Sequence, residues 1–130
     1  MNVDFSVDET RILIAAIVRA KFDNPSAFEP YFGSPILAEA CKRLAASLVA
    51  AYEEDGDSGS VAAWRKWGRW SGRNYEREVI VTYAVELPVW SEWSREEKFE
   101  ALESFCSPFE PSSSEVFEMI DLIDETRSNS

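Results

Sequence analysis

The chain has 130 residues, a formal net charge of -11 and a hydrophobic content of 45%. This length suits one domain better than two, and the hydrophobic content is sufficient for a packed core, which excludes wholesale disorder. Because no histidine is present, Ser-His-Asp catalysis, Cys-His catalysis and histidine metal ligands are excluded as well.

Two cysteines cannot complete a zinc site without histidine. The acidic stretch "EEDGDSG" at 53–59 fails the spacing of an EF-hand calcium loop. We therefore expect a protein that is not an enzyme, binds no metal and needs no cofactor.

No apolar run approaches the ~18 residues of a membrane-spanning helix, and the start "MNVDFSVDE" lacks the basic region of a signal peptide. We expect a cytoplasmic protein without a membrane partner. In that reducing compartment Cys41 and Cys106 should be free, buried thiols rather than a disulfide.

The first two helices have clear start signals. Ser6 and Glu9 form a capping box before the apolar repeat Ile12, Leu13, Ala16, Ile17 and Ala20, which predicts a helix over 7–22. A second helix is predicted over 35–54, where a serine at 34 precedes a proline at the first helical position. The Pro-rich stretch between them predicts a packed loop that buries Phe28, Tyr31 and Phe32.

Ser60 is expected to cap a third helix, which carries "WRKWGRW" at 64–70. On a regular helix, Trp64, Trp67 and Trp70 fall within an arc of about 120°. The cations lie on the opposite side: Arg65, Lys66, Arg69 and Arg73.

This segregation favours a buried tryptophan face and a solvated basic face. Nucleic-acid binding would need aromatic rings and cations on one surface, and the acidic body would repel both phosphate and anionic lipid. The remaining interpretation is a basic surface that binds an acidic partner. A helix break at Gly68 would weaken this facial argument.

Segment 79–87 is ambiguous, because its β-branched residues favour a strand whereas the lack of a partner strand favours a buried helix. Ser94 and Glu97 then form a capping box for a helix over 94–105. The last helix is predicted over 114–125, followed by a frayed tail. One face of this helix should be apolar: Val116, Phe117, Ile120 and Ile123. The sum is an all-α, compact bundle of five or six helices, a single acidic helical domain over residues 1–130.

Residues 79–130 contain twelve acids and three bases, which is more acidity than solubility requires. We expect these two acidic helices to bind a basic protein, with exposed tryptophans as the apolar anchor. The candidate partner-binding residues are Trp90, Glu92, Trp93, Glu96, Glu97, Glu100, Glu103, Glu118, Asp121, Asp124 and Glu125.

The profile is that of a small acidic inhibitor of a nucleic-acid-handling protein, as toxin immunity proteins and anti-CRISPR proteins are. The basis is an analogy of size, charge and fold class, without a sequence motif. The alternative is a non-catalytic helical adaptor or self-assembling subunit, possible as a homo-oligomer, that uses the Trp/Arg helix 64–77. Its partner-binding residues would be Arg65, Lys66, Arg69 and Arg73. Neither hypothesis involves direct contact with nucleic acid.

Overall fold

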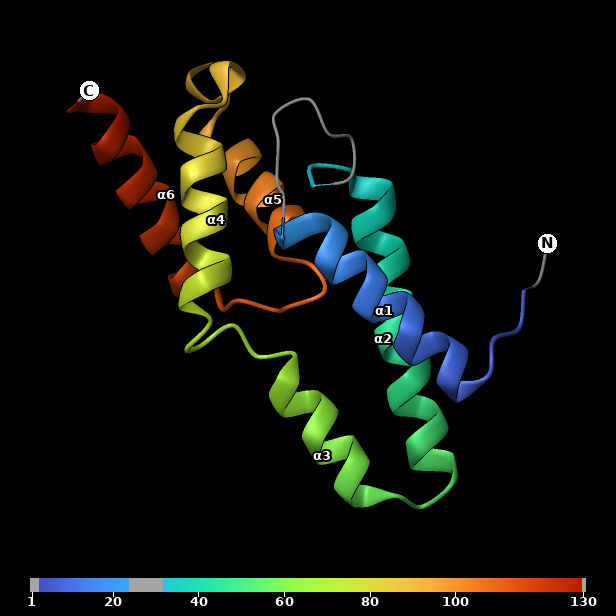
Figure 1. The fold of residues 1–130 in the computed structure, drawn as a ribbon. Helices are drawn as coiled ribbons and strands as arrows, with labels where there is room; N and C mark the ends of the chain where they lie inside the picture. The colour runs from blue at the N-terminus through green and yellow to red at the C-terminus, as the bar shows by residue number, and fades with distance from the viewer. Residues whose placement is uncertain (1–2, 24–31, 130) are drawn as a thin grey trace.

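The computed structural model describes residues 3–23 and 32–129, which form an all-α bundle (Figure 1). The described residues form six α-helices: α1 (Val7–Phe22), α2 (Pro35–Glu54), α3 (Ser58–Trp67), α4 (Asn74–Val85), α5 (Arg95–Cys106) and α6 (Ser113–Ser128). A short 3-10 helix, η1 (Pro88–Glu92), lies between α4 and α5. The predicted fold class is confirmed, and the ambiguous segment 79–87 is mainly helical because it belongs to α4.

The capping signals place the helix starts as expected. Ser6 and Glu9 form the capping box of α1, the Ser34 hydroxyl accepts from the Leu37 backbone N–H at the start of α2, and Ser94 with Glu97 repeats the capping box at α5. A further capping box, Ser112 with Glu115, begins α6. The last helix therefore starts at Ser113 and runs through the predicted tail to Ser128.

The main core lies among α4, α5 and α6, which stand beside one another in Figure 1. Ile80 of α4, Leu102 of α5 and Ile120 of α6 are fully buried at its centre. The α1–α2 hairpin covers this core through Phe22 and Phe32, whose rings meet edge to face at 5.9 Å. Phe32 is thus buried as predicted, whereas Phe28 and Tyr31 lie outside the described residues.

The predicted apolar face of the first helix is wrong in detail. Ile12 is 69% exposed, whereas Thr10, Ile14, Lys21 and Phe22 are buried. The cause is that α1 packs mainly against α2, so its buried residues lie only at i, i+4, i+11 and i+12, counted from Thr10.

The third helix also differs from its prediction. Asp57, not Ser60, caps α3, and the helix ends at Trp67 with Gly68 as its C-cap. Trp70 is buried beyond the helix end, next to a single backbone bridge between Arg69 and Glu110. The regular helix over 64–73 on which the two-face argument depended is therefore not formed.

Lys21 is a fully buried cation at the end of α1. Its ammonium donates to the backbone oxygens of Ser104 at 2.9 Å and Ser107 at 2.5 Å, which lie at the C-terminal end of α5. Burial lowers the pKa of Lys21 from 10.5 to about 8. The two cysteines are free and buried, as expected, and burial raises the pKa of Cys41 from 9.0 to about 11 and that of Cys106 further.

These shifts predict a maximum of stability near pH 9. Between pH 8 and 10.5 the unfolded chain keeps the Lys21 proton that the folded chain has lost, so stability rises with pH. Above pH 9.0 the unfolded thiols lose protons that the folded chain retains, so stability falls. We expect the free energy of unfolding to rise by about 0.5 kcal/mol from about pH 7.5 to 9 and then to decline, measured by urea unfolding.

The control is Lys21→Met, which keeps the length of the side chain and removes its titration. In this variant the free energy of unfolding should decline above about pH 9 without first rising from about pH 7.5. A native protein whose stability only falls over the same range would contradict the assignment.

Candidate protein-interaction surface

Helices α5 and α6 carry eight of the eleven predicted binding residues, and three glutamates of α5 lie on one open face. Leu102 and Phe105 of α5 point into the core, which leaves Glu96, Glu100 and Glu103 exposed at i, i+4 and i+7 on the outer side. None of these three carboxylates forms an ion pair with a residue that the structure describes. Their charge is therefore uncompensated within the described chain.

A hollow of about 580 Å³ lies between the two helices, and we call it the α5–α6 hollow. Its apolar part is formed by Phe99 and Phe117, whose ring centroids are 5.1 Å apart. Its lining is completed by Arg95, Glu96, Glu100, Glu103 and Ser113. Exposed aromatic side chains with a polar rim are a feature of protein-interaction sites.

Phe117 was predicted on the apolar face of the last helix, but this residue is 38% exposed. Val116, Ile120 and Ile123 are fully buried, as predicted. At about 100° per residue, Phe117 lies about 60° beyond Ile120 at the edge of this apolar arc. A helical-wheel plot would thus have identified Phe117 as a boundary residue, but not its contact with Phe99.

Arg95 closes one side of the hollow. Its guanidinium forms an ion pair with Asp121 at 3.1 Å and lies 4.9 Å from the centroid of the Phe117 ring. The predicted binding residue Asp121 is therefore exposed but already paired. Arg95 therefore pairs with α6 and forms no ion pair with Glu96, Glu100 or Glu103 of α5.

Trp90 cannot be the apolar anchor that the sequence suggested, because it is only 1% exposed. Its indole N–H donates to Asp124 Oδ1 at 2.8 Å, and Lys98 Nζ binds the same oxygen at 3.1 Å. Partial burial opposes ionisation of Asp124, but these two hydrogen bonds and the nearby cations outweigh it and lower the pKa. Asp124 thus joins η1, α5 and α6.

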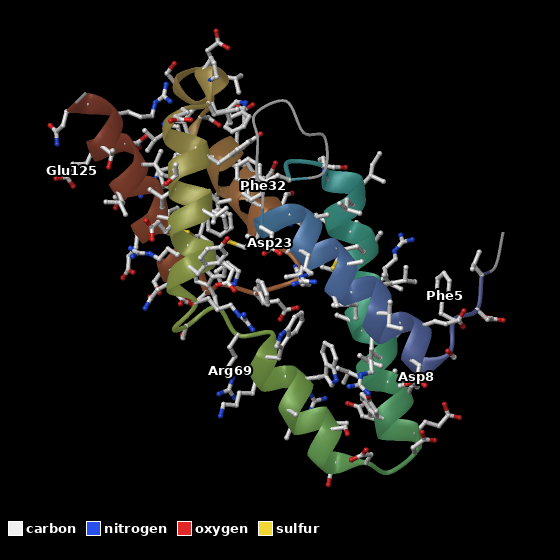
Figure 2. The ribbon with its side chains drawn as sticks, viewed as in Figure 1. Phe5, Asp8, Asp23, Phe32, Arg69 and Glu125 are labelled. Atoms are coloured by element: carbon white, nitrogen blue, oxygen red, sulfur yellow. The ribbon has the colours of Figure 1, made fainter. Side chains whose placement is uncertain are left out.

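Of the remaining predicted partner-binding residues, three are exposed and two have structural contacts. Glu92 and Glu125 are exposed without an ion pair to a described residue, and Figure 2 shows Glu125 on the outer side of α6. Glu97 serves the capping box, and Trp93 is half-buried with its ring 5.9 Å from that of Trp90. Glu118 is exposed on the opposite flank of α6 from Phe117, where it lines a small hollow.

The cations of the alternative site do not form one surface. Arg73 forms an ion pair with Glu76 at 3.2 Å and lies 3.7 Å from the centroid of Phe109, inside an aromatic cluster. Arg65 is paired with Glu53. The two remaining cations are exposed and have no ion pair to a described residue: Lys66 and Arg69.

A second hollow, of about 620 Å³, lies between α2 and α3 and was not expected from the sequence. Trp64 and Trp67 form one part of its lining, and alanines of α2 form another. Cations and carboxylates are mixed around it, including the Arg65–Glu53 pair, so it has no clear charge preference. Figure 2 shows the Arg69 side chain projecting outward beyond the end of α3.

Comparison with protein-family models, curated proteins and solved structures finds no match to this chain. None of the described helices has the length and apolar character needed to cross a membrane. Among the described residues, no group of three or more histidine, cysteine, aspartate or glutamate side chains is arranged to hold a metal ion. The functional argument therefore depends on the geometry of the α5–α6 hollow.

The contacts of Asp124 predict a structural role. Replacing Asp124 with Ala leaves the buried Trp90 N–H without its acceptor and should lower the free energy of unfolding by about 1–3 kcal/mol. The neighbouring exposed substitution Glu125→Ala should change it by less than about 0.5 kcal/mol. Urea unfolding at pH 7 compares the two variants, and equal stabilities would show that Asp124 belongs to the surface alone.

Proposed function

We propose that this chain is a small, acidic, non-catalytic inhibitor that binds and blocks a basic, nucleic-acid-handling protein in the cytoplasm. The observation that carries the proposal is the exposed row of Glu96, Glu100 and Glu103 beside the open Phe117 ring. Toxin immunity proteins and anti-CRISPR proteins offer an analogy for such an inhibitor, based on size, charge and fold class.

The proposed mechanism is electrostatic and steric. The unpaired carboxylates of α5 would occupy cationic positions that otherwise contact phosphate, and the net charge of -11 would accelerate the encounter with a basic surface. Phe99 and Phe117 replace Trp90 as the proposed apolar anchor, because burying an aromatic side chain gives a charged interface its slow dissociation. An interface of about 1,600 Å² would suffice to cover the partner's own binding surface.

The alternative function is a non-catalytic adaptor or self-assembling subunit. Four exposed apolar side chains on the N-terminal half favour self-association, and Figure 2 shows one of them, Phe5, ahead of α1. The four are Val3, Phe5, Ile12 and Ile36. This function predicts a defined oligomer on size-exclusion chromatography, which the inhibitor function does not require.

The proposal is tested by capture of a basic partner at low salt. The immobilised native protein should retain a basic, nucleic-acid-binding protein from a lysate of its source at about 50 mM salt and release it as salt rises. The triple variant Glu96→Gln, Glu100→Gln, Glu103→Gln should slow association with that protein by about tenfold or more. Addition of the native chain should prevent the captured protein from binding nucleic acid.

The matched control changes the same net charge at exposed glutamates away from the hollow: Glu54→Gln, Glu78→Gln and Glu86→Gln. It should retain most of the native association rate. Equal losses of association rate in the two triple variants would mean that net charge alone determines this rate. Association that does not depend on salt would show that the carboxylates are not part of the recognition surface.

A further inference from the structure

We infer that the α5–α6 hollow is an arginine-recognition site, in which a guanidinium group of the partner stacks on Phe117 and pairs with the glutamates of α5. This inference rests on the proposed function and specifies the side chain that the partner inserts. It distinguishes arginine from lysine, which general electrostatic attraction does not.

The first support is that the chain itself already binds guanidinium groups in this way. Arg95 lies 4.9 Å from the centroid of Phe117 while pairing with Asp121 at 3.1 Å. Arg73 lies 3.7 Å from the centroid of Phe109 while pairing with Glu76 at 3.2 Å. Each site combines an aromatic face, which attracts the planar cation, with a carboxylate, which accepts its hydrogen bonds.

The second support is that the hollow offers the same combination beside the position of Arg95, because Phe117 remains 38% exposed although Arg95 lies 4.9 Å from its ring centroid. Phe99 and Phe117 supply the aromatic surface, and Glu96, Glu100 and Glu103 supply carboxylates without an ion pair to a described residue. At about 580 Å³, the hollow has room for a side chain that enters from outside. The cation that lines it, Arg95, is already neutralised by Asp121.

The third support is the chemistry of the two possible cations. Lysine carries a compact, strongly hydrated ammonium that pairs with carboxylates but stacks poorly. Arginine carries a flat and weakly hydrated guanidinium, with five donors that can bind carboxylates while one face covers an aromatic ring. A hollow with both aromatic and carboxylate surfaces therefore prefers arginine.

The test compares two probes of equal charge, N-acetyl hexa-arginine amide and N-acetyl hexalysine amide, by isothermal titration calorimetry at about 50 mM salt. The native protein should bind the arginine peptide about fivefold more tightly or better. Phe117→Leu keeps an apolar side chain but removes the ring, so it should reduce this ratio below about twofold while binding of the lysine peptide persists.

The control Phe5→Leu changes another exposed phenylalanine and should keep the native ratio. Phe99→Leu provides a second variant of the hollow in case Phe117→Leu is poorly folded, which circular dichroism would reveal. Equal affinity of the native protein for the two peptides would overturn the inference and leave the acidic docking surface intact. A preference that survives both hollow variants would also overturn it, whereas failure to bind either peptide would overturn the docking proposal itself.

Discussion

Cations that lie outside the helix donate hydrogen bonds to the C-terminal ends of three helices in this structure. The last carbonyl groups of a helix have no partner within the helix and carry partial negative charge, so they need donors from elsewhere. Arg73 donates to the Trp67 oxygen at the end of α3, and Arg127 donates to the oxygens of Val85 at 2.6 Å and Leu87 at 3.0 Å at the end of α4. Lys21 donates to the backbone oxygens of Ser104 and Ser107 at the end of α5.

The Lys21 contact determines how the two halves of the fold are joined. It fixes the end of α1 to the end of α5, and the Ser107 hydroxyl donates to the Ala38 oxygen of α2 at 2.8 Å in the same region. Burying an ammonium is unfavourable, as its lowered pKa indicates, but its hydrogen bonds satisfy carbonyl groups that would otherwise be buried without partners. The contact thus joins α1 to α5, while packing against α4 and α6 also holds α5 in place.

The sequence predicts the features that depend on neighbouring residues and misses those that depend on distant contacts. The capping boxes of Ser6 and Ser94 require residues only three positions apart, and both are present. The indole of buried Trp90 has its acceptor 34 residues away, and the contact of Phe117 with Phe99 depends on how α5 crosses α6. No spacing rule within one helix contains that information.

The candidate surface was likewise predicted in part. Glu96, Glu100 and Glu103 could be placed on one exposed face because their spacing alone fixes it. The hydrogen bonds to Asp124 could not be predicted, because their donors, Trp90 and Lys98, lie on η1 and α5. The break of α3 at Gly68 was recognisable as a possibility, since glycine is a poor interior helix residue, but only the fold decides whether the helix continues.

The use of cations as helix caps has a consequence for the acidic surface. Lys21 is fully buried at a helix end, and Arg73 at the end of α3 pairs with its neighbour Glu76, so neither cation pairs with the glutamates of α5. The chain has only 13 lysines and arginines for 24 acids. Around the α5–α6 hollow, Arg95 is drawn to Asp121 and Lys98 to Asp124, so both pair with α6. The three outer glutamates of α5 are left facing solvent beside an open aromatic ring. Because like charges at i, i+4 spacing repel, this arrangement lowers the stability of the free protein and favours its association with a cationic group from outside.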